Sequence, residues 1–216
     1  MDRDSTVAVK VWSDFALFTR PEMKVERVSY PVMTPSAARG VLEAIFWQPE
    51  FAWRVREIHI LKPIRWFSIL RNEVARRVAK FPAPLLEDYA DAPDLRTQRH
   101  AVILRDVAYV IIATMHLRPH ATDPLAKYRA IFRRRVARGQ CFQRPYMGCR
   151  EFAVQFGPPR AQDRPIPTHL ELGTMLFDMR FARRPEEDTV PLFFQAVVRE
   201  GVVRVPQNLY QRTEAS

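Results

Sequence analysis

The chain has only two cysteines, no long apolar run and no signal sequence, and these absences narrow its class. Cys141 and Cys149 form no CxxC pair, and no histidine lies at ligand spacing from them. This pattern argues against a zinc site and favours reduced thiols. No apolar run approaches the ~20 residues of a membrane span, and the first residues lack a basic-then-apolar leader. We therefore expect a cytoplasmic protein without a membrane span.

The motifs of nucleotide-dependent and metal-dependent enzymes are also missing. The sequence contains no GxxxxGK[ST], HExxH or GxGxxG. No serine or cysteine has an evident histidine partner, because the five histidines are scattered: His59, His100, His116, His120 and His169. The acidic clusters at 87–88 and 186–188 are typical of a solvated surface rather than of a two-metal carboxylate site. We expect no cofactor and no metal.

Positive charge is what the chain has in excess. It carries 34 Lys and Arg against 24 Asp and Glu, which gives a net charge of +10 and a pI near 10.2. Such an excess favours a polyanionic partner through counterion release, most simply RNA or DNA. Arginine predominates, and its planar fork suits phosphates and base edges. The alternative is a basic surface without a specific partner.

A first helix is predicted over residues 35–46. Thr34 can accept a hydrogen bond from the first turn, and Pro35 stands where its missing N–H is not needed. The apolar positions that follow have helical spacing, so one face is buried: Ala38, Val41, Leu42 and Ile45. Gly40 costs about 1 kcal/mol relative to alanine in mid-helix, and close approach of another backbone would explain it.

A second helix is predicted over residues 124–138. It opens in the same way, at Asp123-Pro124, and Gly139 follows as a C-terminal cap. One helix is apolar and the other is basic, and each stands between strand-like runs. This arrangement indicates a nucleic-acid-binding fold rather than a small-molecule enzyme.

The strand pattern predicts an α+β fold. Alternating or β-branched runs at 7–13, 53–64, 101–117 and 151–156 combine with the helices into β-α-β-β-α-β, the ferredoxin-like order. Residues 65–80 begin strand-like, and the proline-rich stretch 81–95 is predicted to be a loop. We assign residues 1–156 to a ferredoxin-like domain. Residues 157–216 are assigned to a smaller antiparallel β domain with a hairpin at Glu200-Gly201 and a frayed tail from 207.

The second helix offers a candidate nucleic-acid surface. At about 100° per residue, Leu125, Phe132 and Val136 fall on one side, flanked by Tyr128 and Arg129. The opposite side collects the basic side chains of Lys127, Arg134 and Arg138, and Arg133 is a further RNA-binding candidate of this helix. No acidic residue lies three or four positions away between 124 and 138, and unrelieved like charge suits a helix that meets phosphates. An ordinary solvated face is the alternative.

Other candidate contacts are spread along the chain. Arg99, His100 and Arg105 lie at the start of and within the 101–117 strand, where solubilising charge is the alternative role. Arg39 adds a basic position on the first helix. Four aromatic residues could stack on bases or belong to the core: Trp47, Trp53, Trp66 and Phe67.

Four segments carry a resemblance to a known family. They read VWSDFALFTRPEMKVERVSYPVMTPSAARGVLEAIFW, QRHAVILRDVAYVI, GCREF and LGTMLFDMRF. In this order they resemble the CRISPR-associated Cas-five family of the type I-C system, from Val7 to Pro206. Members belong to the RAMP superfamily, which implies a ferredoxin-like domain followed by a smaller β domain.

The resemblance implies a role in RNA processing. In type I-C systems this subunit replaces the separate Cas-six nuclease, cleaves precursor CRISPR RNA at the base of the repeat hairpin, and stays on the 5′ handle. Its partners would be the backbone and large subunits of the Cascade complex, and duplex DNA is a further candidate. Attack by the ribose 2′-OH needs no metal and leaves a cyclic phosphate. A non-catalytic subunit that only binds the 5′ handle is the alternative.

The family's catalytic residues match this sequence poorly. Some members use a Tyr late in the first helix and a Lys-His pair at the start of the second. The resemblance places Phe46 in the Tyr slot, Ala126 in the Lys slot and Lys127 in the His slot. It therefore implies Lys127 as a catalytic candidate, acting as a positive charge or, with a pKa lowered by neighbouring arginines, as an acid or base. Tyr128 is a possible acid or a buried neighbour of Leu125, and Phe46 is the third candidate for the site.

Overall fold

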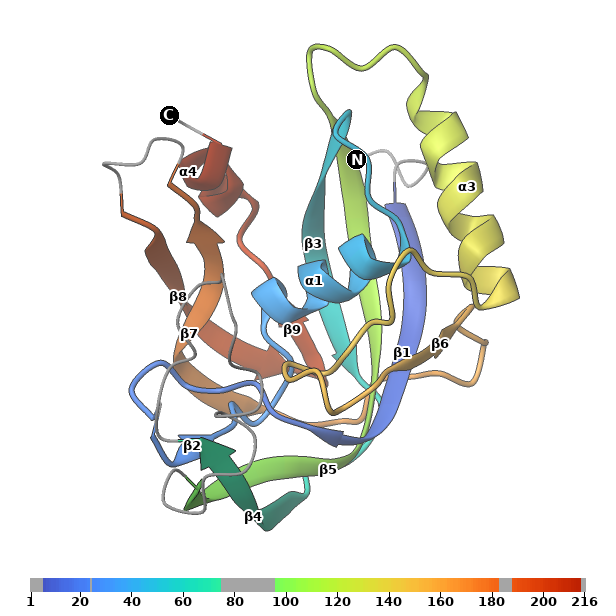
Figure 1. Ribbon diagram of the computed structural model, residues 1–216. Coiled ribbons are helices and arrows are strands. Elements are labelled where there is room, and N and C mark those ends of the chain that lie inside the picture. The colour runs from blue at the N-terminus through green and yellow to red at the C-terminus, as the bar shows by residue number, and fades with distance from the viewer. Residues whose placement is uncertain (1–5, 24, 75–95, 183–187, 215–216) are drawn as a thin grey trace, which may run out of the picture.

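A single curled sheet organises the protein. The computed structural model describes residues 6–23, 25–74, 96–182 and 188–214. Seven strands follow one another in the order β6-β1-β5-β3-β9-β8-β7, and β2 and β4 also pair with β5. The helices α1 and α3 lie on one side of the sheet (Figure 1). None of the described helices is long and apolar enough to cross a bilayer.

The elements have the following bounds. The strands are β1 Thr6–Ala16, β2 Arg27–Val28, β3 Phe51–Ile60, β4 Trp66–Val74, β5 Arg96–Leu117, β6 Gln155–Gly157, β7 Leu170–Arg180, β8 Val190–Arg199 and β9 Val202–Arg204. The helices are α1 Pro35–Ile45, α3 Leu125–Arg138, the 3-10 turn η3 Gln207–Leu209 and α4 Tyr210–Glu214.

The predicted order of elements is present. Along the chain β1, α1, β3, β5, α3 and β6 succeed one another, and in the sheet β6-β1-β5-β3 are antiparallel neighbours. In β1 the valines at positions 7, 9 and 11 are buried in the core that also holds Leu42 of α1 and Phe132 of α3. Side chains at positions 8, 10 and 12 therefore point to the other face of the sheet.

β5 is long because it serves two pairings. Its second half pairs with β1 and β3, and its first half pairs with β2 and β4. Asp106 stands between the halves with φ 55°, a left-handed conformation that Asp tolerates better than most residues. Its carboxylate accepts a hydrogen bond from Lys62 Nζ at 2.5 Å, which lowers the pKa of Asp106. The bend lets one strand continue from the main sheet into the β4–β5 hairpin.

α1 begins as predicted, but the surroundings of Gly40 differ from the prediction. The Ala37 N–H donates to Thr34 Oγ1 at 3.2 Å, and Pro35 is the first helical residue. Gly40 does not lie against another backbone, since no atom would come within 4 Å of a Cβ built there. The expectation of close backbone contact was wrong, and Gly40 instead faces open space beside a pocket that Thr34 and Arg39 also line.

α3 ends as predicted and begins differently. Gly139, with φ 65°, caps the helix through its N–H. At the other end Pro124 is the cap residue, and no side chain among the described residues caps the first turn. The prediction that helix two begins in the same way as helix one was therefore wrong at one point, because the Asp123 carboxylate binds Lys127 instead of accepting from a backbone N–H.

The C-terminal strands continue the sheet. β7, β8 and β9 are antiparallel, the β8–β9 turn at Glu200-Gly201 is the predicted hairpin, and β9 pairs with β3. The expectation of a frayed tail was wrong for the described part: Tyr210 is buried and its hydroxyl accepts from the Val55 N–H at 2.7 Å. The fourth strand of the core is β6, which is shorter and starts later than the predicted 151–156. The predicted loop at 81–95 and the acidic pairs Glu87-Asp88 and Glu186-Glu187 lie outside the described residues.

Candidate nucleic-acid interface

The start of α3 brings together two of the three residues predicted to be catalytic. Lys127 Nζ lies 2.7 Å from the Asp123 carboxylate and the side chain is about half exposed. This hydrogen bond, together with the negative charge, raises the pKa of Lys127. Of the two roles predicted for Lys127, the one that needs a pKa lowered by neighbouring arginines was wrong, because Asp123, one residue before the stretch that contained no acid, supplies a partner. Lys127 is thus a permanent positive charge at neutral pH.

Tyr128 lies beneath Lys127 and faces inwards. It is 4% exposed, and burial raises the pKa of its phenol, helped by the negative charge of Glu50. Within the described residues its hydroxyl and one Glu50 carboxylate oxygen are buried without hydrogen-bond partners. Tyr128 therefore keeps its proton, but its hydroxyl cannot reach a bound RNA while the side chain stays buried.

Phe46 is part of the core rather than of the surface. It is 1% exposed, and its ring centroid lies 5.4 Å from that of Phe51, which in turn lies 5.4 Å from that of Tyr128. The Arg135 guanidinium covers Phe46 at 4.9 Å and donates to the Ile45 carbonyl oxygen at 2.8 Å. Phe46 connects α1 to α3 by packing and has no exposed surface to offer RNA.

Two residues near Lys127 and Tyr128 were not singled out by their sequence pattern. Glu50 comes from the turn before β3, where its carbonyl oxygen accepts from the Arg118 N–H at 2.8 Å. His120, exposed in the loop between β5 and α3, has Nε2 3.1 Å from the Pro49 carbonyl oxygen. They approach α3 only through the packing of two distant loops, which spacing in the sequence does not reveal.

The outer face of α3 is basic as predicted. Tyr128, Phe132 and Val136 form its buried side. Arg133, Arg134 and Arg138 are exposed, and of these only Arg133 makes a hydrogen bond with a described residue, a long one of 3.5 Å to the Thr6 carbonyl oxygen. Apart from Lys127, this face has no acidic partner within the part of the chain that the structure describes. It offers guanidinium groups to solvent over three turns of helix.

The arginines and the histidine of β5 lie elsewhere. Arg99 and His100 are on the β4–β5 hairpin, and Arg99 Nε lies 3.9 Å from the Glu73 carboxylate. Arg105 is exposed and covers the Phe67 ring at 5.9 Å. These three residues belong to a different end of the sheet from α3 (Figure 1), so the structure does not unite them with Lys127.

The four aromatic candidates divide between surface and core. Trp47, Trp66 and Phe67 are 50%, 48% and 40% exposed and remain able to meet a ligand. Trp53 is 2% exposed, and its indole N–H donates to the Phe46 carbonyl oxygen at 2.9 Å. Trp53 is therefore a core residue.

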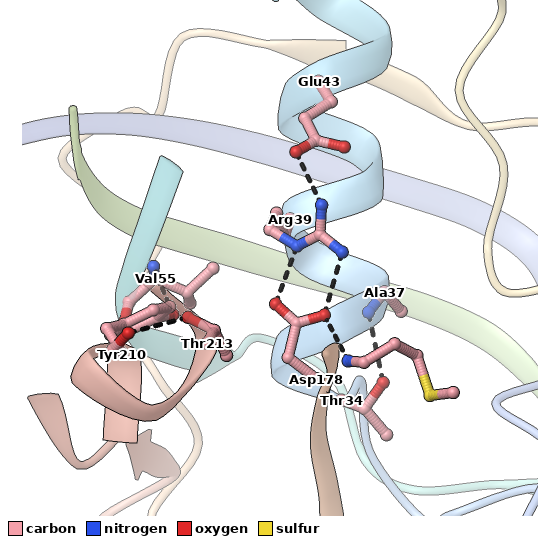
Figure 2. A network of polar contacts seen from close by, with 9 residues as sticks. Thr34, Ala37, Arg39, Glu43, Val55, Asp178, Tyr210 and Thr213 are labelled. Carbon is pink, nitrogen blue, oxygen red and sulfur yellow. Dashed lines mark hydrogen bonds and ion pairs between the residues drawn. The ribbon is translucent and has the colours of Figure 1, made fainter. Parts of the chain in front are cut away.

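Arg39 is the most tightly held of the predicted RNA-binding residues (Figure 2). Nε and Nη2 each donate to the Asp178 carboxylate at 2.8 Å, and Nη1 donates to Glu43 at 2.6 Å. Burial lowers the pKa of this guanidinium, but the two carboxylates raise it above its usual value. The Met179 N–H also donates to Asp178 at 2.7 Å. Arg39 thus joins α1 to β7, and its charge is neutralised by acids.

Possible metal ligands are dispersed in the described ranges 6–23, 25–74, 96–182 and 188–214. No group of three His, Cys, Asp or Glu side chains there is arranged to hold a metal ion.

Solved structures share this fold. A CRISPR-associated protein superposes with a TM-score of 0.67 at 21% identity, covering 95% of this chain and 94% of that one. A functionally uncharacterized protein from Streptococcus mutans superposes with a TM-score of 0.66 at 19% identity, covering 94% and 93%. The curled antiparallel sheet with two helices is therefore a fold found among CRISPR-associated proteins.

Sequence comparison narrows this class to one family. The Cas5d model, described as "CRISPR-associated protein (Cas_Cas5)", matches residues 6–206. A relative from Thermus thermophilus, named CRISPR pre-crRNA endoribonuclease Cas5d, is 48% identical, covering 94% of this chain and 92% of its own. One of the same name from Mannheimia succiniciproducens is 41% identical, covering 93% and 94%. The chain belongs to the Cas5d family, which confirms the resemblance noted in its four segments.

Proposed function

We propose that this protein is a metal-independent endoribonuclease that cleaves precursor CRISPR RNA within the repeat. The observation that carries the proposal is its 41–48% identity, over more than nine-tenths of the chain, to two relatives named as pre-crRNA endoribonucleases. The exposed arginines of α3 support it, because they offer a phosphate-binding surface next to Lys127.

The chemistry would be attack of the ribose 2′-OH on the adjacent phosphate. The P–O5′ bond breaks as the new O2′–P bond forms, leaving a 2′,3′-cyclic phosphate and a 5′-OH. The step needs a proton acceptor for the 2′-OH, a donor for the 5′ oxygen and positive charge at the non-bridging oxygens. Lys127 suits the last role because its raised pKa keeps it charged. Tyr128 suits the donor role because it keeps its proton, although it must become accessible first.

A second function, binding the 5′ handle without cutting, is favoured by a specific observation. The residue in the family's Tyr slot is Phe46, which has no proton to exchange and is buried. A subunit with this substitution could retain the RNA without processing it. Cleavage and binding assays distinguish the two functions.

The remaining assignments follow from the same family. We infer a ferredoxin-like domain over residues 1–156 and a smaller C-terminal β domain over 157–216. After cleavage the protein would stay on the 5′ handle, beside the backbone and large subunits of a type I-C Cascade complex. Duplex DNA is a further proposed ligand of its basic surface, since the chain carries a net charge of +10.

The test of this function is incubation of the purified protein with end-labelled repeat RNA in EDTA. We expect one cut at a single position of the repeat. Binding without any cut, over a series of repeat sequences, would contradict the nuclease and support the handle-binding subunit. A cut that appears only with Mg²⁺ or Mn²⁺ would contradict the metal-independent chemistry.

The α3 surface yields a separate prediction about affinity. Replacing Arg134 and Arg138 with alanine should weaken binding to many RNA sequences and flatten the slope of log K against log salt by about one for each lost phosphate contact. Filter binding between low and moderate salt measures this slope. The double variant Arg180→Ala/Arg204→Ala removes two exposed arginines from β7 and β9 and serves as a charge-matched control. An unchanged slope in the α3 variant would mean that this face is only solvated.

A further inference from the structure

A second basic surface lies on the face of the sheet opposite to α1 and α3. Because Val9 and Val11 point into the helical core, their neighbours Lys10 and Trp12 point to the other side. The chain returns to this side after β6, where the segment 158–168 runs beside the end of β3 and donates from the Ile166 N–H to the Ile60 carbonyl oxygen at 2.9 Å.

A pocket of about 460 Å³ opens between this segment and the sheet. Its chemistry comes from one indole, four cations and one carboxylate: Trp12, Lys10, Lys62, Arg160, Arg164 and Asp163. The volume lies in the range of small-ligand sites, roughly 300–1,000 Å³. A positively charged hollow with an aromatic ring in its wall has the composition of a single-stranded nucleic-acid site.

The space beside Trp12 is kept open by small residues. Its cross-strand neighbour is Ala108 on β5, and Gly157 of β6 lies on its other side, where a Cβ would stand 3.9 Å from the indole. The indole N–H donates to the Gln155 side-chain oxygen at 2.7 Å, which fixes the ring. Lys10 Nζ lies over the indole at 5.7 Å from the ring centroid. A ring that is already held in place loses little entropy when a base stacks on it.

The rim of the pocket is held by one ion pair. Asp163 accepts from Lys10 Nζ at 2.5 Å and from the Arg160 N–H at 2.7 Å, so the segment is tied to β1. Burial raises the pKa of Asp163, whereas these two donors lower it. The net shift is downward, so the carboxylate stays charged. Arg160 and Arg164 are exposed, and their guanidinium groups make no hydrogen bond or ion pair with any described residue. The fold therefore positions two cations at the rim without using them internally.

We propose that this pocket binds one nucleotide of single-stranded RNA, with its base against Trp12 and its phosphates at Arg160 and Arg164. This inference rests on the proposed function, in which the substrate is RNA, and it adds a second contact on the side of the sheet away from α3. A base in a duplex cannot enter, because its faces are stacked on its neighbours. The site thus selects an unpaired nucleotide, and RNA bound at both sites must pass around an edge of the sheet.

Two variants test the two halves of the pocket. Trp12→Leu keeps an apolar side chain but removes the stack, and should weaken binding of repeat RNA about 30-fold, a middle value for loss of one base–aromatic contact. Trp12→Phe should restore most of the affinity. Arg160→Gln with Arg164→Gln should flatten the salt slope by about 0.7 for each lost contact to a single strand. Arg180→Gln, on β7 at the far end of the sheet order, is the single-charge control.

Cross-linking tests the contact in the wild-type protein, so its result does not depend on whether a variant folds. RNA carrying 5-iodouridine at each unpaired position in turn should cross-link to Trp12 under ultraviolet light from one position, mapped by mass spectrometry. A fully paired RNA of the same sequence should give no such product. Cross-links confined to other residues, or an unchanged affinity in Trp12→Leu together with an unchanged slope in the arginine variant, would overturn the inference. A wild-type protein that neither binds nor cuts repeat RNA would instead refute the proposed function.

Discussion

Lys127→Ala is expected to slow cleavage of repeat RNA about 100-fold while RNA affinity changes little. One preorganised charge at a developing oxyanion contributes on this scale, and an interaction that strengthens in the transition state lowers the rate more than it lowers binding. The structure favours this role over proton exchange, because Asp123 raises the pKa of Lys127 and keeps its ammonium group charged. Single-turnover rates at saturating protein, measured beside equilibrium affinities, separate the two effects.

Companion variants make the Lys127 result specific. Lys127→Arg keeps the charge and should retain most of the rate, whereas a proton-transfer role would be lost in both variants. Arg204→Ala removes another exposed cation, which lies on β9 with its Nε 3.7 Å from the carboxylate of Glu57 on β3, and this variant should cut normally. A native cleavage rate in Lys127→Ala with intact binding would exclude this residue, and Tyr128 and His120 would then be the next side chains to replace.

Arg39→Ala is expected to lower the free energy of unfolding by about 3–5 kcal/mol, the usual cost of leaving a buried charge without its partner. Asp178, whose side chain is 8% exposed, would lose both hydrogen bonds from the guanidinium, and Glu43 would lose one. Because the pair links α1 to β7, the loss should be seen as a lower midpoint in urea denaturation followed by circular dichroism.

The paired variant separates structure from RNA binding at Arg39. Replacing Arg39 with Met and Asp178 with Leu removes both charges, and apolar substitutes for a buried pair are often neutral. We expect its stability to return close to that of the wild type, and its RNA affinity to be unchanged. If the double variant is stable but binds RNA weakly, Arg39 is an RNA contact after all, as the sequence alone suggested.

Local patterns predicted much of the fold. Thr34-Pro35 and Gly139 mark the ends of helices through backbone chemistry that needs no distant partner, and both boundaries are present. The alternation of Val7, Val9 and Val11 assigned one face of β1 to the core for the same reason. The tail was mispredicted because its order depends on Tyr210 reaching Val55, a contact between residues 155 positions apart.

The candidate site was less predictable because its contacts are long-range or lie just outside a motif. Arg39 looked like a free cation until the fold brought Asp178, 139 positions away, against it. Asp123 was predicted to start the helix, and its pairing with Lys127 was missed because it precedes the helix by two residues. Trp12 gave no signal as a binding residue, since its surroundings come from a segment about 150 positions further along the chain.

The most direct test of the proposed chemistry is a repeat RNA with one 2′-deoxy nucleotide at the mapped cleavage position, incubated with the protein in EDTA. We predict that this RNA binds with native affinity and is not cut, whereas the all-ribose RNA is cut once and leaves a 2′,3′-cyclic phosphate. Cleavage of the deoxy-substituted RNA at the same bond, or a product with a 3′-OH, would contradict attack by the 2′-OH and with it the mechanism proposed for this protein.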